Sequence, residues 1–134
     1  MRLSDKTRER FYFVFRVLVG LMFLQHGAQK LFGAFSGPGL AGFAGFAGIP
    51  VWLAGVVGTI EFVGGIFIVI GLFTRTTAVI SAINLIVALI IVHFPNGVIP
   101  VINGGELAIL YIATFLILIS LGPGKFAVDN LIRR

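Results

Sequence analysis

The amino-acid sequence predicts an all-α integral membrane protein, a four-helix bundle that forms one domain over residues 1–134. Hydrophobic residues make up 58% of the chain, charged residues make up 11%, and the mean hydropathy is +1.09. A soluble domain carries charge on roughly a quarter of its residues, so this composition excludes a soluble protein. Because a membrane span takes about 20 residues, the chain has room for four spans and their loops.

Four apolar runs set the limits of the expected spans. Basic residues precede the first run, but it is long, contains charged residues of its own and lacks a small-residue cleavage pattern. We therefore expect a retained helix rather than a signal peptide. Proline and glycine mark ends of the other runs, as they do at helix starts and stops. The spans are predicted at residues 11–32, 50–73, 76–94 and 104–121.

The lysines and arginines outside these spans predict the orientation. They lie in the two chain ends and at Arg75, whereas residues 33–49 and 95–103 contain none. Cationic loops stay in the cytoplasm, so we expect both termini there and these two loops on the outer side. In the first loop Phe43 and Phe46 are three residues apart, which indicates a short interfacial helix; a flexible cap is the alternative.

Composition also limits the chemistry. The chain has no cysteine, which excludes disulfides, thiolate nucleophiles and cysteine-ligated clusters. The net charge of +5 is concentrated at the chain ends and predicts membrane orientation rather than nucleic-acid binding. Two histidines without a third ligand do not predict a metal site, and ligation of a haem by His26 and His93 is a weak interpretation.

Polar side chains inside the spans are the candidate functional residues, because a charge in the bilayer centre costs about 2.5–3.5 kcal/mol on insertion scales. At a rise of about 1.5 Å per residue, they fall into two levels. The inner level predicts an ion pair between Arg16 and Glu61. It also holds Asn84, which together with Arg16 is a candidate ligand-binding residue. The outer level predicts a ligand site formed by His26, Lys30, His93 and Glu106.

Each of these residues also has a structural interpretation. Arg16 and Glu61 would then serve packing and orientation, the histidines would be hydrogen-bonded interfacial residues, and Lys30 would extend to the outer headgroups. A weak internal repeat also pairs His26 with Glu61 and His93 with Glu106. Two duplicated helical hairpins and a chance match both remain open as explanations of that repeat.

Short motifs occur in a fixed order along the chain. They are Arg16, residues 23–33 (FLQHGAQKLFG), 61–65 (EFVGG) and 71–75 (GLFTR), His93, residues 104–107 (GGEL) and 122–124 (GPG), and Asp129. In this order they resemble the DoxX family over nearly the whole length of the chain. This resemblance implies a small four-helix inner-membrane protein of a bacterial or archaeal cell. It also implies a link to thiosulfate:quinone oxidoreductase and to membrane complexes that handle thiol and oxidative stress.

Two hypotheses about function follow. In the first, the chain is the membrane subunit of a quinone-linked redox assembly with a soluble enzyme partner. Glu61 or Glu106 would relay protons, His26 or His93 would bond a quinone carbonyl, and Arg16 would hold Glu61. In the second, the chain is a non-enzymatic scaffold or a carrier of a small molecule. Whether the chain catalyses a reaction alone, and whether it forms a homo-oligomer, stays open at this point.

Overall fold

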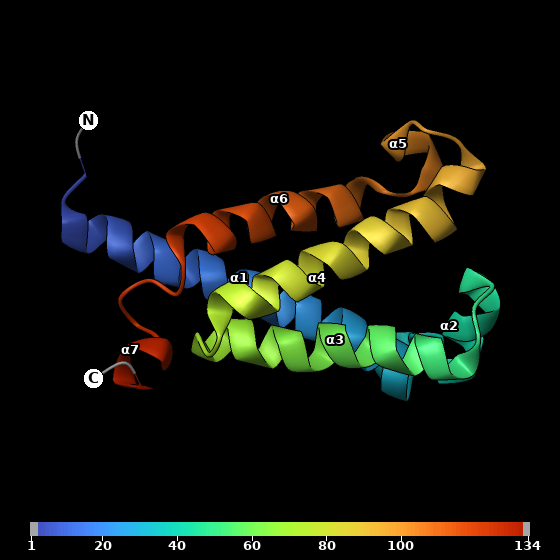
Figure 1. Ribbon diagram of the computed structural model, residues 1–134, viewed down its shortest axis with the longest axis horizontal. Coiled ribbons are helices and arrows are strands. Elements are labelled where there is room, and N and C mark those ends of the chain that lie inside the picture. The colour runs from blue at the N-terminus through green and yellow to red at the C-terminus, as the bar shows by residue number, and fades with distance from the viewer. Residues whose placement is uncertain (1–2, 133–134) are drawn as a thin grey trace.

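The structure, a computed structural model, describes residues 3–132, which form helices joined by loops and turns, with no strand in that range. This confirms the predicted all-α class. Arg2, Arg133 and Arg134, three of the cations behind the predicted orientation, lie outside the described residues. The helices are α1 (Asp5–Phe32), α2 (Gly39–Ala47), α3 (Val51–Ile70), α4 (Thr74–Ala88), α5 (Pro100–Asn103), α6 (Glu106–Leu121) and α7 (Asp129–Ile132) (Figure 1).

Three helices are long and apolar enough to cross a membrane: α1, α3 and the helical stretch Thr74–Asn96 that α4 begins. Helix α6 has 16 residues, so it spans about 24 Å against a hydrocarbon core of about 30 Å. The described part of the chain has seven α-helices, whereas the sequence predicts a bundle of four. Helix α2 lies in the first loop, where a short helix is expected from Phe43 and Phe46. Helices α5 and α7 have four residues each and were not expected.

Local signals explain where the long helices start and bend. Helix α1 begins six residues before the predicted span, because the Ser4 side chain accepts a hydrogen bond from the Thr7 N–H at 3.2 Å. It ends at Gly33, whose φ of 67° is the left-handed conformation that glycine adopts readily. Helix α4 continues as a π-helical turn, Leu89–His93, before the chain reaches Pro95.

Helices α1 and α3 are antiparallel and make the closest packing in the molecule. At each level of their interface a glycine on one helix faces a larger residue on the other, which lets the backbones approach. A methyl group on Gly27, for example, would lie 2.2 Å from the backbone nitrogen of Phe62. The four levels of this glycine interface pair Gly20 with Val69, Leu24 with Gly65, Gly27 with Phe62, and Leu31 with Gly58.

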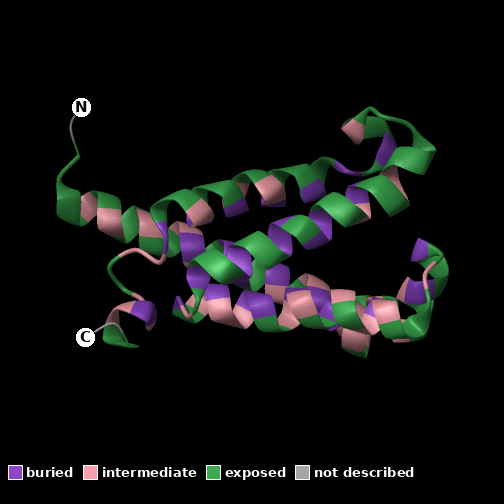
Figure 2. Ribbon diagram, viewed as in Figure 1, coloured by how far each residue is buried: buried purple, intermediate pink, exposed green. Residues whose placement is uncertain are grey.

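Helix α6 packs along α4 and reaches α1 through aromatic side chains. The ring of Phe23 lies 4.9 Å from that of Phe115 and 5.3 Å from that of Tyr111. Buried residues lie mainly on the helix faces turned toward the middle of the bundle, and exposed residues on the outer faces (Figure 2). Many of the exposed residues are large and apolar. The start of α1 and helix α7 lie at one end of the bundle, whereas α2 and α5 lie at the other (Figure 1).

Candidate functional site

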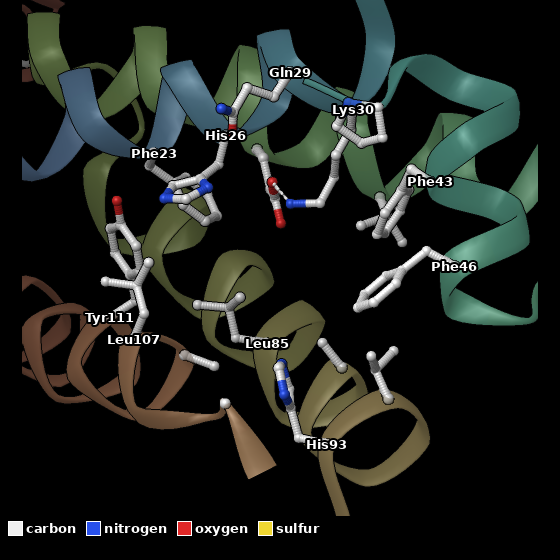
Figure 3. A pocket seen from close by; sticks show the side chains of 17 residues that line it. Phe23, His26, Gln29, Lys30, Phe43, Phe46, Leu85, His93, Leu107 and Tyr111 are labelled. Carbon is white, nitrogen blue, oxygen red and sulfur yellow. Dashed lines mark hydrogen bonds and ion pairs between the residues drawn. The ribbon is translucent and has the colours of Figure 1, made fainter. Parts of the chain in front are cut away.

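A cavity of about 290 Å³ opens at the end of the bundle that carries α2 and α5. We call this end the pocket end and the cavity the pocket. Side chains reach it from α1, α2, α3, α4, the π-helical turn and α6 (Figure 3). The lining is largely apolar, with the polar groups of His26, Lys30, Glu61 and His93 among the phenylalanines.

An ion pair lies in the wall of the pocket. The Lys30 ammonium on α1 donates a hydrogen bond to Oε2 of Glu61 on α3. Glu61 is 3% exposed, and the Lys30 Nζ also lies 5.1 Å from the centre of the Phe43 ring on α2, within range of a cation–π contact. A buried carboxylate is costly without a partner, so Lys30 is what allows Glu61 to be ionised here.

The predicted ion pair between Arg16 and Glu61 is wrong. Arg16 instead donates hydrogen bonds to three backbone carbonyls, those of Pro123, Phe126 (2.6 Å) and Val69 (3.3 Å). The depths estimated from the sequence were counted from the cytoplasmic ends of the predicted spans. The glycine interface sets a different register between α1 and α3. It places Glu61 opposite the segment 27–31, so Lys30 is the cation within reach.

Two histidines face this ion pair from different elements. The His26 ring packs edge-on against Tyr111 of α6, with 5.8 Å between ring centres. His93, on the π-helical turn, lies across the pocket from His26 and Lys30 (Figure 3). Its Nδ1 is 3.1 Å from the Asn103 carbonyl oxygen. Since a carbonyl only accepts hydrogen bonds, Nδ1 carries a proton, and Nε2 is left for a second contact.

The remaining predicted residues lie elsewhere. Glu106 is exposed in the first turn of α6, about 200° around that helix from Ala108, which lines the pocket. Asn84 lines a neighbouring groove between α3 and α4 instead. The structure thus brings together four of the seven predicted site residues, His26, Lys30, Glu61 and His93, and separates them from Arg16, Asn84 and Glu106.

Sequence reasoning missed two residues that shape the pocket. Tyr111 lines it, and its hydroxyl is buried without a hydrogen-bond partner among the described residues. Asn103 positions His93, donating to the Gly97 carbonyl at 2.7 Å and accepting from the Gly105 N–H at 2.7 Å. A tyrosine within an apolar span and an asparagine before a glycine pair were the available signals.

The opposite end of the bundle, which we call the closed end, is held by hydrogen bonds. Besides the Arg16 contacts, the Tyr12 hydroxyl donates to the Gly122 carbonyl at 2.6 Å. The Asp129 carboxylate accepts from the backbone N–H groups of Phe73 (2.7 Å) and Thr74 (3.0 Å) at the start of α4. Phe73 has a φ of 46°, a strained conformation that the Asp129 contact stabilises.

The comparisons with known proteins identify the family. A family model described as DoxX matches residues 11–94, from α1 through the π-helical turn. The chain belongs to the DoxX family. The matched region contains both members of the ion pair and both histidines, whereas Asn103 and Tyr111 lie beyond it.

Relatives match nearly the whole DoxX chain. An uncharacterized protein of Haemophilus influenzae is 39% identical over 94% of this chain and 93% of its own length. The "Putative oxidoreductase CatD" of Bacillus subtilis is 32% identical, over 93% and 89% respectively. The "Inner membrane protein YqjF" of Escherichia coli is 30% identical, over 90% and 91%. No solved structure matches. Together with the apolar helices, these relatives support a multi-pass membrane protein.

The donor set indicates which ligands the pocket suits. Within residues 3–132, no three histidine, cysteine or carboxylate side chains come together to hold a metal ion. The pocket instead offers an ammonium, a carboxylate and two imidazoles in an apolar cavity. The ammonium and the imidazoles can donate hydrogen bonds to a polar ring, and the carboxylate and the imidazoles can exchange protons with it.

Proposed function

We propose that this DoxX protein is a four-span inner-membrane protein of a bacterial cell, whose pocket binds the head group of a quinone. It would act as the membrane subunit of a redox assembly, with electrons supplied by a soluble partner enzyme. The observation that carries this proposal is the Lys30–Glu61 ion pair in an apolar cavity faced by two histidines. The printed names of the relatives, an oxidoreductase and an inner membrane protein, agree with it.

The proposed topology has α1, α3, the stretch Thr74–Asn96 and α6 as spans, with both termini in the cytoplasm. An even number of spans agrees with the start of α1 and helix α7 lying at the same end of the bundle (Figure 1). The basic residues concentrate at that end, and the positive-inside rule then gives it the cytoplasmic side. The pocket end would face the outer leaflet.

The pocket residues fit a quinone head group in size and chemistry. A volume of about 290 Å³ is at the lower limit of small-molecule pockets, about 300 Å³, which suits a single ring. Reduction of a quinone to a quinol takes up two electrons and two protons. Lys30 and His26 would donate hydrogen bonds to one carbonyl oxygen, His93 would contact the other, and Glu61 would pass protons to the site.

The test of this function is binding of duroquinone, a single-ring quinone without a tail, to the purified protein in mild detergent. We expect Lys30→Met and Glu61→Gln each to weaken binding tenfold or more, measured by calorimetry. The chain offers a matched control in the exposed pair Lys125–Glu9, whose N···O distance is 3.3 Å. Lys125→Met and Glu9→Gln should leave the affinity unchanged.

Two results would contradict the proposal. The first is that duroquinone does not bind the wild-type protein. The second is that it binds both pocket variants with wild-type affinity, which would show that the pocket is not the quinone site. Topology is tested separately, with reporters fused after residue 134 and inserted near Gly97. We expect the first reporter in the cytoplasm and the second outside, and the reverse pattern would refute the orientation.

A further inference from the structure

A second cavity adjoins the pocket. It is a groove of about 430 Å³ between α3 and α4, closed at one end by α2. Four residues line both cavities: Phe43, Val57, Ala88 and Val92. The groove and the pocket therefore adjoin at these four side chains.

The two cavities differ in chemistry. The pocket contains the ion pair and both histidines, whereas the groove is lined by apolar side chains, with Asn84 as its one polar side chain among the described residues. The outer rim of the groove is exposed on the side of the bundle, with Ile83 at 56% and Val87 at 46% exposure. In a bilayer this rim faces the lipid hydrocarbon.

The junction between the cavities depends on a small residue and an aromatic one. Ala88 is the last residue of α4 and leaves space that a larger side chain would fill. Phe43 of α2 lies at the same junction and is also the ring that contacts the Lys30 ammonium. The residue that borders the polar head site thus also borders the start of the groove.

We propose that the pocket and the groove form one site for an amphiphile, with a polar ring in the pocket and a hydrocarbon tail in the groove, entering sideways from the bilayer between α3 and α4. This inference rests on the proposed function and names the class of substrate: a quinone with a long tail rather than a water-soluble one. The tail gains little free energy from leaving lipid, because lipid chains are as apolar as the groove. Its role is to orient the head group.

The experiment maps the position of the tail. The probe is a trimethylbenzoquinone whose alkyl tail ends in a photoreactive diazirine, added to protein in phospholipid nanodiscs. Cross-linked residues are located by mass spectrometry. We expect them in the segments 49–60 and 80–92, and we expect excess duroquinone to suppress them because it displaces the head group. Cross-links spread over all lipid-facing helices, unaffected by duroquinone, would overturn the inference.

Two variants make the result specific. Ala47 lines the groove but not the pocket, so we expect Ala47→Phe to fill part of the groove and to reduce groove cross-linking at least fivefold while duroquinone still binds. Ala113→Phe places the same side chain on an exposed position of α6 and should change neither. If duroquinone binds but tail cross-links are scattered, the inference fails and the quinone pocket stands. If duroquinone does not bind at all, the proposed function and the inference fail together.

Discussion

Each end of the bundle holds a cation from α1, and the two cations have different surroundings. At the closed end Arg16 is 1% exposed and is surrounded by neutral backbone carbonyls from α3 and the C-terminal segment. At the pocket end Lys30 is paired with an acid and borders a cavity. A guanidinium presents five donors in a fixed fork and can bind several acceptors at once. Arg16 therefore holds the C-terminal segment against the bundle, whereas Lys30 borders the pocket.

The family motifs divide along the same line. Residues 71–75, 122–124 and Asp129 meet at the closed end, where their backbone groups and the Asp129 carboxylate make the contacts that hold the turn before α4. The motif pieces around His26, Glu61 and His93 meet at the pocket. Part of the DoxX pattern therefore serves folding, and a residue in that pattern is not by itself evidence of a site.

The largest expected effect tests the closed end. Arg16→Gln removes the hydrogen bonds to Pro123 and Phe126, and bonds to charged groups contribute about 1.5–3 kcal/mol each. We expect a loss of about 3 kcal/mol or more in the free energy of unfolding, measured by titration with dodecyl sulfate in mixed micelles. Arg10→Gln, on an exposed residue of the same helix, should change stability by less than about 0.5 kcal/mol. Equal stability of the two variants would contradict the fastening role of Arg16.

The sequence could predict the helices but only part of the site. Apolar periodicity and the proline and glycine signals identified every long helix, because those signals are local. The pairing of Lys30 with Glu61 depends on the register between α1 and α3, which the glycine interface sets. A rise per residue counted from assumed span ends cannot give that register. The sequence does contain a signal for it, because Gly20 and Gly27 on α1 have the same spacing as Gly58 and Gly65 on α3.

Substitutions in the glycine interface test whether the pocket end and the closed end are independent. A methyl group on Gly27 would lie 2.2 Å from the Phe62 backbone nitrogen, and one on Gly20 would lie 2.7 Å from that of Val69. We expect Gly27→Ala and Gly20→Ala each to cost about 1–3 kcal/mol of stability, the range for overpacking. Because Gly27 adjoins the ion pair, only Gly27→Ala should also weaken duroquinone binding. Equal loss of binding in both variants would mean that the two ends are not independent.

His93 allows its structural and ligand contacts to be tested apart. His93→Asn keeps a donor at the position of Nδ1 for the Asn103 carbonyl but removes Nε2, whereas His93→Gln does the reverse. We expect His93→Asn to retain wild-type stability and to bind duroquinone about tenfold more weakly, the equivalent of about 1.4 kcal/mol for one lost hydrogen bond. His93→Gln should lose stability and keep more of the affinity. If calorimetry shows that His93→Gln binds duroquinone more weakly than His93→Asn, Nε2 does not contact the ligand.

The smallest expected effect concerns Asn84, which the sequence placed among the ligand-binding residues and the structure places in the groove. Its side-chain nitrogen is buried and has no hydrogen-bond partner within the described part of the chain. A buried amide without a partner is unfavourable, so Asn84→Leu should leave stability unchanged or raise it by up to about 1 kcal/mol. Duroquinone affinity should not change, because Asn84 does not line the pocket. A tenfold loss of affinity would show that the head group reaches past the junction at Ala88, and the division between head site and tail groove would then be wrong.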